Sequence, residues 1–103
     1  MKLVYSTFPS MEEAKNVGLK LVEERLCGCY NCWHIESAYW WEGKIVTDEE
    51  VACVFKTPDE KQEQLIKKLA EFHPYSEPAI FSIPVEKVSP GYEKWLKDVT
   101  GTG

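Results

Sequence analysis

The sequence predicts an α+β protein of the ferredoxin-like class, with the element order β-α-β-β-α-β, an antiparallel sheet and an additional C-terminal helix. Stretches rich in β-branched and aromatic residues alternate with stretches whose apolar residues recur at helical spacing. In addition, the two longest strand-like stretches meet at a tight turn. Two split β-α-β units in this order form a four-stranded sheet with both main helices on one face. We expect a single domain over residues 1–103, and another two-layer α/β sandwich is the weaker alternative.

The first segment is predicted to form a strand followed by a helix. Residues 2–8 (KLVYSTF) are rich in β-branched and aromatic residues and end at Pro9. Ser10 precedes Glu13 by three residues, the spacing of a capping box, in which the hydroxyl accepts from the first helical turn and the carboxylate reaches back. The helix that begins there carries apolar residues on one face: Met11, Ala14, Val17, Leu21 and Val22.

A long hairpin is predicted in the middle of the chain. Residues 31–41 (NCWHIESAYWW) contain no Pro or Gly and are dense in aromatic and β-branched residues, which favours a strand. Residues 42–44 (EGK) form a tight turn, and residues 45–56 (IVTDEEVACVFK) return as the second arm.

The second helix has clear start and stop signals. Residues 57–60 (TPDE) offer Thr57 as the N-cap, Pro58 at the first helical position and two acids near the helix dipole. The helix is expected to stop at His73 because Pro74 cannot continue it. Its apolar face consists of Leu65, Ile66, Leu69 and Ala70.

The remaining residues predict a fourth strand and a last helix. Residues 78–88 (PAIFSIPVEKV) have the composition of a strand, and Ser89 with Pro90 begins a short helix. That helix carries Tyr92, Trp95, Leu96 and Val99.

Composition excludes several classes of function. The formal net charge of −5 argues against a nucleic-acid partner, since phosphate binding draws on clustered Lys and Arg. No apolar run approaches the roughly 20 residues that span a bilayer, so we expect no membrane partner. The N-terminus passes directly into a strand-like segment without the pattern of a signal peptide, which predicts a cytoplasmic location. In that reducing compartment the four cysteines are expected to be free thiols.

The strands predict that the protein associates with copies of itself. Two helices cover only one face of a sheet, and a sheet face in water normally shows alternating apolar and polar residues. In the long strand, apolar residues instead occupy both odd-numbered and even-numbered positions, so both faces are apolar. No element remains to cover the second face. Large exposed apolar faces mark association surfaces, so we expect an oligomer joined through its sheets, with long hairpin arms pairing with a neighbour. The odd-numbered set is Trp33, Ile35, Tyr39 and Trp41, and the even-numbered set is Tyr30, Cys32, Ala38 and Trp40.

The cysteine-rich stretch CGCYNCWH is predicted to be a strand and not a metal or redox site. Because successive side chains of a strand point to opposite faces, Cys27 and Cys29 should point to one side and Cys32 and His34 to the other, unless a bulge intervenes. The spacing lacks the second pair of ligands of a structural zinc site, and a strand lacks the helix N-terminus of a thioredoxin-type motif. We favour small thiols packing at the junction, with Cys53 in the core. His34 is expected at the surface or in an interface.

The loop at residues 73–78 (HPYSEP) is the better candidate for a site. His73, Tyr75 and Glu77 lie between two prolines that rigidify the loop, and together they could take a divalent ion, of which copper would bind most tightly. The alternative is that His73 only caps the C-terminus of the second helix. Residue chemistry alone favours the capping role.

Six motifs occur in order along nearly the whole chain: VYSTFP, VEERLCGC, YWWEGK, FKTP, FHPYSEPAI and YEKWL. Together they resemble the CutA family of divalent-cation tolerance proteins, and YWWEGK with HPYSEP is the most distinctive pair. The resemblance implies a ferredoxin-like subunit in a tight homotrimer, an architecture similar to that of the PII signalling trimers. It also implies a role in tolerance to copper and other divalent metals, with copper binding in some members.

The resemblance points to particular ligand positions. Family members with an assigned copper site use a first-strand cysteine and two consecutive histidines, and the matching positions here are Ser6, Phe72 and His73. His73 is therefore the first candidate ligand for copper or another divalent cation, with Cys29 and Glu77 as weaker candidates. Cys29 matches a family cysteine, while Cys27 and Cys32 are peculiar to this sequence. No cofactor is expected to be required for folding.

A PII-like module and an enzyme are the two alternative functions. A PII-like signalling or scaffolding trimer would bind a small ligand or protein partner in clefts between subunits, lined by Lys56, Tyr75, Glu77, Trp40 and Trp41. An enzyme is disfavoured, because the fold's acylphosphatases need a glycine-rich loop with arginine, and the chain's one arginine, Arg25, lies at a helix end. We therefore expect no catalytic residues.

Overall fold

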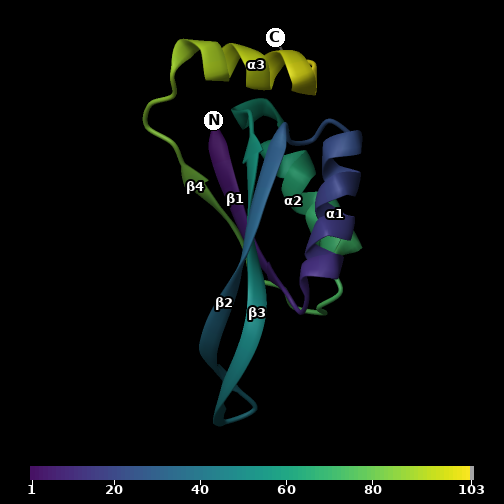
Figure 1. The fold of residues 1–103 in the computed structure, drawn as a ribbon, viewed down its shortest axis with the longest axis vertical. Coiled ribbons are helices and arrows are strands. Elements are labelled where there is room, and N and C mark those ends of the chain that lie inside the picture. Colours follow the sequence, from purple (N-terminus) through teal and green to yellow (C-terminus); the bar gives the residue numbers. More distant parts are fainter. Residues whose placement is uncertain (103) are drawn as a thin grey trace.

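The computed structural model describes residues 1–102 and confirms the predicted fold class. The elements, in chain order, are β1 (Lys2–Phe8), α1 (Met11–Glu23), β2 (Cys29–Trp41), β3 (Lys44–Thr57), the 3-10 turn η1 (Asp59–Lys61), α2 (Gln62–Phe72), β4 (Ile80–Pro84) and α3 (Pro90–Thr100). The four strands form one antiparallel sheet in the order β2-β3-β1-β4. In Figure 1, α1 and α2 lie together on one side of the sheet, and α3 lies across its upper end.

The core fills the space between the sheet and the two main helices. Alternate residues of β1 and β3 are buried there, because a strand turns every second side chain to the same face. The register pairs these residues directly, as in Val4 with Phe55 and Phe8 with Val51. From the helices the core receives Ala14, Val17, Leu21, Leu65 and Leu69.

The helix signals are confirmed at some positions and wrong at another. Ser10 Oγ accepts a hydrogen bond from the backbone N–H of Glu13 at 3.2 Å, as the capping box predicts. Thr57, in contrast, does not cap α2. Its buried hydroxyl donates to the carbonyl of Leu26 at 2.7 Å, and the chain makes η1 before α2 begins at Gln62 without a side-chain cap. The hydroxyl that the local pattern assigns to the helix is therefore bonded to a carbonyl that is distant in the sequence.

The fourth strand is shorter than predicted. Its pairing with β1 runs from Ser6 opposite Ile80 to Lys2 opposite Pro84, where β1 itself begins. Beyond Pro84 the chain has no strand to pair with, so the apolar residues up to Val88 lie outside the sheet.

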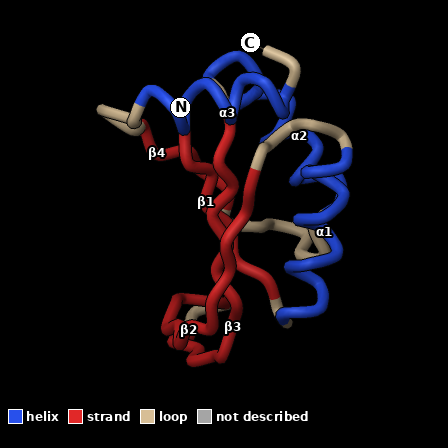
Figure 2. Tube along the Cα trace, turned by 45° about the horizontal axis from the view of Figure 1, so that its top comes forward, coloured by secondary structure: helices blue, strands red, loops and turns tan. Residues whose placement is uncertain are grey.

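Beyond the four-stranded region, β2 and β3 continue as a two-stranded arm. The last residue of β1, Phe8, pairs with Val51, so within the sheet residues 35–50 have strand pairing only between β2 and β3. Glu42 and Gly43 form the turn with φ values of 50° and 77°, and positive φ at both central residues defines a type I′ hairpin. Figure 2 shows this arm curling at the end opposite α3.

The other face of the sheet is not covered by α1 or α2 and is rich in apolar side chains. We call it the open sheet face. Tyr5 packs against Phe81 there, with ring centroids 4.9 Å apart, and Phe81 remains 50% exposed. Trp33 adds a side chain that is 44% exposed. The apolar members of the open sheet face are Leu3, Tyr5, Trp33, Ile35, Val54, Phe81 and Ile83.

None of the helices within residues 1–102 is long and apolar enough to cross a membrane.

Candidate functional site

His73 lies where the second helix gives way to the loop of residues 73–79. It is the C-cap of α2, in an extended conformation with φ −70° and ψ 135°, because Pro74 disfavours the helical conformation in the preceding residue. The ring turns inward and stacks on Phe8 of β1, with centroids 4.4 Å apart and planes 15° apart. His73 is therefore a buried residue with only 8% of its surface exposed.

Hydrogen bonds engage both ring nitrogens of His73. The backbone N–H of Tyr75 donates to Nδ1 at 3.1 Å, so Nδ1 is unprotonated. In the neutral ring the proton is therefore on Nε2, which donates to Ser6 Oγ at 3.0 Å. Burial lowers the pKa of His73, and a backbone hydrogen bond at Thr7 opposes that shift only in part. The ring is thus held in its neutral form.

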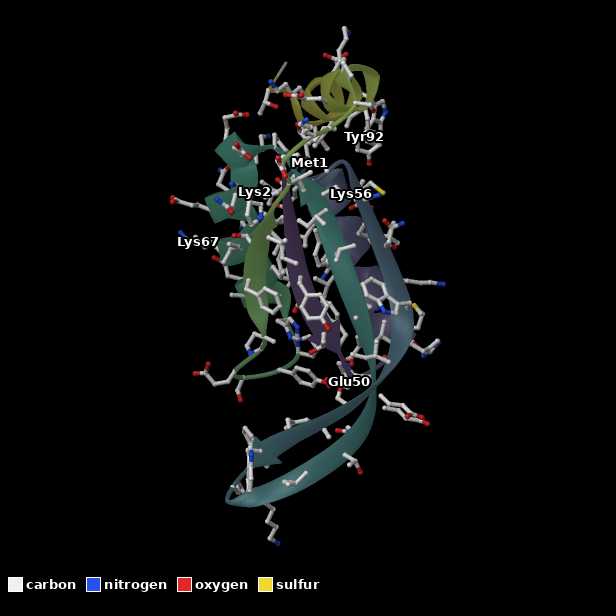
Figure 3. The ribbon with its side chains drawn as sticks, turned by 90° about the vertical axis from the view of Figure 1, so that its left-hand side faces the viewer. Met1, Lys2, Glu50, Lys56, Lys67 and Tyr92 are labelled. Atoms are coloured by element: carbon white, nitrogen blue, oxygen red, sulfur yellow. The ribbon has the colours of Figure 1, made fainter. Side chains whose placement is uncertain are left out.

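Tyr75 connects this loop to the root of the hairpin arm. Its hydroxyl donates to Glu50 Oε2 at 2.9 Å, and its ring centroid lies 5.2 Å from that of His73. Burial, followed by the hydrogen bond and charge of Glu50, raises the pKa of Tyr75, so the phenol stays protonated. Figure 3 shows Glu50 where β3 leaves the body of the protein for the arm.

The Ser6–His73 pair does not have the geometry of a catalytic dyad. A serine nucleophile needs a histidine nitrogen that accepts its proton, but Nε2 carries a proton and acts as the donor. Ser6 is also completely buried, so a substrate has no path to the hydroxyl.

The three candidate ligands are not brought together within one chain. Cys29 pairs with Lys56 on the open sheet face, whereas His73 lies on the helix-covered face with Ser6 and Phe8. Glu77 is exposed in the loop. Within residues 1–102, no group of three His, Cys, Asp or Glu side chains is arranged to hold a metal ion.

The hydrogen bonds of His73 also oppose metal binding by the ring. A cation at Nδ1 would displace the N–H of Tyr75, and a cation at Nε2 would displace a proton and the contact with Ser6. Within residues 1–102 of one chain, His73, Cys29 and Glu77 as they are arranged do not fit a divalent cation.

The cysteines separate differently from the strand prediction. Cys27 is buried in the core with its pKa raised to about 12, mainly by burial, while Cys29 is half-buried on the open sheet face. Gly28 N–H donates to the carbonyl of Lys56 at 3.0 Å, although the register partner of Lys56 is Cys29. Two residues therefore face one, as in a β-bulge, and this bulge turns the two thiols apart.

Two further predictions on these strands are confirmed. Cys53 is fully buried in the core, and His34 is exposed on β2. Sequence reasoning missed three contacts: Ser6 with His73, Tyr75 with Glu50, and Cys32 opposite Cys53. The turn sets the register of the last pair, but the predicted turn over residues 42–44 was one residue too long, because Lys44 already pairs with Trp41.

The residues proposed for a PII-like cleft are also apart in one chain. Lys56 lies over the ring of Tyr92 at 5.7 Å, and Figure 3 places both at the α3 end, away from Glu50 and its partner Tyr75. Trp40 and Trp41 lie beside the turn at the tip of the arm. A separate concavity of about 590 Å³ lies along the arm, lined by Glu36, Ser37, Ala38, Thr47, Asp48 and Glu49.

Comparisons with known proteins identify the family of the chain. The sequence profile described as CutA1 divalent ion tolerance protein matches residues 2–99. The divalent-cation tolerance protein CutA of Thermotoga maritima is 50% identical, over 95% of this chain and 97% of that protein. The protein of the same name from Pyrococcus horikoshii is 44% identical, over 97% of this chain and 98% of that protein.

Solved structures of similar proteins share the fold. CutA1 from Pyrococcus horikoshii superposes with a TM-score of 0.94 at 42% identity, covering 96% of this chain and 97% of that chain. The periplasmic divalent cation tolerance protein CutA from Archaeoglobus fulgidus gives a TM-score of 0.93 at 35% identity, covering 97% and 99% of the two chains. With the family profile, the relatives and the fold in agreement, the chain belongs to the CutA1 divalent ion tolerance family.

Proposed function

We propose that this protein works as a non-catalytic homotrimer that binds copper or another divalent cation and takes part in the response to metal ions. The observation that carries the proposal is the family match over residues 2–99, since the relatives bear the name of divalent-cation tolerance proteins. The protonation state of the Ser6–His73 pair supports the absence of catalysis.

The open sheet face supports self-association. Its apolar side chains face water in a single chain, and exposed apolar patches of this kind mark interaction sites. A second copy of the same surface has the matching apolar character, and closed symmetric assemblies are the commonest outcome for soluble chains. We assign the open sheet face to the interior of the trimer.

A cation site in this proposal draws on more than one copy. One chain offers no group of three suitable ligands within residues 1–102, so the assembled protein has to supply them. His73, Cys29 and Glu77 are the proposed ligands. Of these, Glu77 is the most accessible, and His73 takes part only if the loop of residues 73–79 rearranges.

Isothermal titration with Cu²⁺ tests the cation proposal. The metal-free wild-type protein is compared with Glu77→Gln, Cys29→Ser and His73→Asn, and the exposed His34→Ala serves as the matched histidine control. The proposal predicts saturable heat for the wild type and for His34→Ala, with weaker binding in at least one ligand variant. Absence of saturable heat from the wild type contradicts cation binding, and a loss confined to His34→Ala places the site elsewhere.

The second candidate is a PII-like trimer that binds a small ligand or a protein partner. The concavity along the arm is the observation that favours it, because this hollow is open to solvent and lined mainly by polar side chains that a solute can reach. Its carboxylates, Glu36, Asp48 and Glu49, favour a cationic ligand. A screen of metabolites and polyamines for shifts in the thermal midpoint distinguishes this function, provided that Cu²⁺ gives no shift in the same assay.

We propose a cytoplasmic location, in keeping with the four free thiols of the chain. A relative of known structure, from Archaeoglobus fulgidus, is described as periplasmic, so the location is open to a direct test. Fractionation of the source cells, followed by immunodetection, should recover the protein with cytosolic markers. Recovery outside the cytoplasmic membrane contradicts this part of the proposal.

A further inference from the structure

Two cysteines face each other across the long hairpin. Cys32 of β2 is the direct register partner of Cys53 of β3. Both side chains lie on the helix-covered face, because Cys53 belongs to the core cluster and Cys32 packs against that cluster. Both are free thiols.

The turn of the hairpin sets the geometry of this pair. In a two-residue type I′ hairpin the flanking residues, here Trp41 and Lys44, form a hydrogen-bonded pair, and pairs then alternate in type along an antiparallel ladder. The register continues unbroken to Cys32 and Cys53, each nine residues from the flanking position. Because the pair type alternates at each position and nine is odd, Cys32 and Cys53 form a non-hydrogen-bonded pair.

That type of pair brings side chains close enough for a covalent bond. Cα atoms of non-hydrogen-bonded pairs are about 4.5 Å apart. Disulfides join residues whose Cα atoms lie about 4.4–6.8 Å apart. Cys32 and Cys53 can therefore be joined within the geometry of the existing sheet.

The two thiols differ in how easily a solute reaches them. Cys53 is completely buried, whereas Cys32 is only partly buried and stands on β2, an edge strand of the sheet. Burial is the main factor that raises the pKa of Cys53, and the adjacent Cys32 thiol contributes to the same shift. An oxidant from solution thus meets Cys32 first, and Cys53 is the thiol placed to react second.

The other two cysteines are not placed to compete. Cys27 is buried at the bulge with a raised pKa, and Cys29 lies on the opposite face of the sheet from Cys32.

We propose that Cys32 and Cys53 form a reversible cross-strand disulfide, with a low-molecular-weight disulfide such as oxidised glutathione as the oxidant. The Cys32 thiol loses its proton, and its sulfur attacks one sulfur of glutathione disulfide, releasing one glutathione thiolate and leaving a mixed disulfide. The Cys53 thiol then loses its proton and attacks the Cys32 sulfur, releasing the second glutathione thiolate. Two protein thiols are oxidised, one glutathione disulfide is reduced, and the two protons leave with the two glutathione molecules.

The test uses the full-length protein in anaerobic buffers with a chelator and a graded ratio of reduced to oxidised glutathione. Free thiols are trapped with an alkylating agent, counted by intact mass and mapped by tandem mass spectrometry. The chelator removes trace copper, so the result does not depend on whether the protein binds a cation. We expect the oxidising buffers to remove two of the four alkylatable thiols and to yield a peptide pair that links Cys32 to Cys53.

Matched variants distinguish this pair from general thiol oxidation. Cys29→Ser, a change at another partly buried thiol of β2, should still form the link, whereas Cys32→Ser should keep its three remaining thiols free. Cys53→Ser should accumulate glutathione on Cys32, and if this core variant does not fold, the Cys32→Ser comparison decides. Four free thiols in the wild type under oxidising conditions overturn the proposal. A link through Cys27 or Cys29, or a stable mixed disulfide at wild-type Cys32, overturns it as well.

Discussion

At the scale of single residues, the main feature is a histidine kept neutral mainly by its burial and by the backbone N–H that donates to Nδ1. Tyr75 N–H fixes the proton on Nε2 of His73, and Ser6 accepts that proton's hydrogen bond. A protonated ring would place a donor at Nδ1 opposite the N–H of Tyr75 and would bury a charge against Phe8. The neutral ring is therefore part of the folded structure.

This histidine predicts a loss of stability in mild acid. Because the pKa of His73 is lower in the folded protein than its ordinary value of 6.5, the unfolded chain binds more protons at pH values just below 6.5. The stabilisation is complete above that pH and declines as the pH falls towards the lowered pKa. Urea unfolding between pH 7.5 and 5 should show this decline. His34→Ala should retain it and His73→Gln should lose it; an unchanged slope in His73→Gln contradicts the assignment.

The Tyr75–Glu50 hydrogen bond predicts measurable coupling between the loop and the arm. Tyr75→Phe removes the donor to Glu50 and should lower the free energy of unfolding by about 1 kcal/mol. Glu50→Gln and the double variant complete a double-mutant cycle, measured by chemical denaturation. Strictly additive effects would show that the two side chains contribute independently.

At the scale of elements, α3 is seated on the sheet through a glycine. A Cβ on Gly28 would come within 2.6 Å of Leu96 Cδ1 and 3.1 Å of Val99 Cγ2, and Leu96 is too deeply buried to move aside freely. Arg25 Nη1 donates to the carbonyl of Val99 at 2.6 Å from the same side. The bulge at Gly28 and Cys29 thus gives α3 its place at the end of the sheet.

Gly28→Ala is therefore expected to loosen α3. The overpacking should cost about 1–3 kcal/mol of unfolding free energy and increase hydrogen exchange in residues 90–100. Gly91→Ala is the matched control, because nothing lies within 4 Å of a Cβ there and alanine favours the first turn of α3. Equal stability of the two variants would contradict the seating role of Gly28.

The elements were largely predictable from sequence because their signals are local. Ser10 with Glu13 and Pro74 each act within a few residues and lie where the pattern indicates. The hairpin turn is also local, and it differs from the prediction only in that Lys44 already belongs to β3. Thr57 does not cap α2, because its hydroxyl donates to a backbone carbonyl 31 residues away in the sequence. The contact of Ser6 with His73, separated by 67 residues, follows only from the packed structure.

At the scale of the whole molecule, the body of the protein has one covered and one open sheet face. α1 and α2 bury the first, and the second leaves Trp33, Phe81 and Ile83 in contact with water in a single chain. The two-stranded arm reaches beyond that body with Trp40 and Trp41 near its tip. These surfaces account for most of the large apolar side chains that one chain leaves exposed.

A charge on the open sheet face should break the assembly. Phe81→Lys places an ammonium group where we expect another copy to pack, so the oligomer should dissociate at concentrations at which the wild type stays associated. Leu19→Lys is the matched control, since Leu19 is similarly exposed but lies on α1, away from the open sheet face. Analytical ultracentrifugation of both variants checks this; an intact Phe81→Lys oligomer removes that face from the interface.

The most direct test of the central claim is the mass of the metal-free wild-type protein in solution, measured by light scattering at micromolar concentration. If three copies of the chain pack through the open sheet face, as proposed, the particle should have three times the mass of one chain. A folded particle with the mass of a single chain would contradict the account.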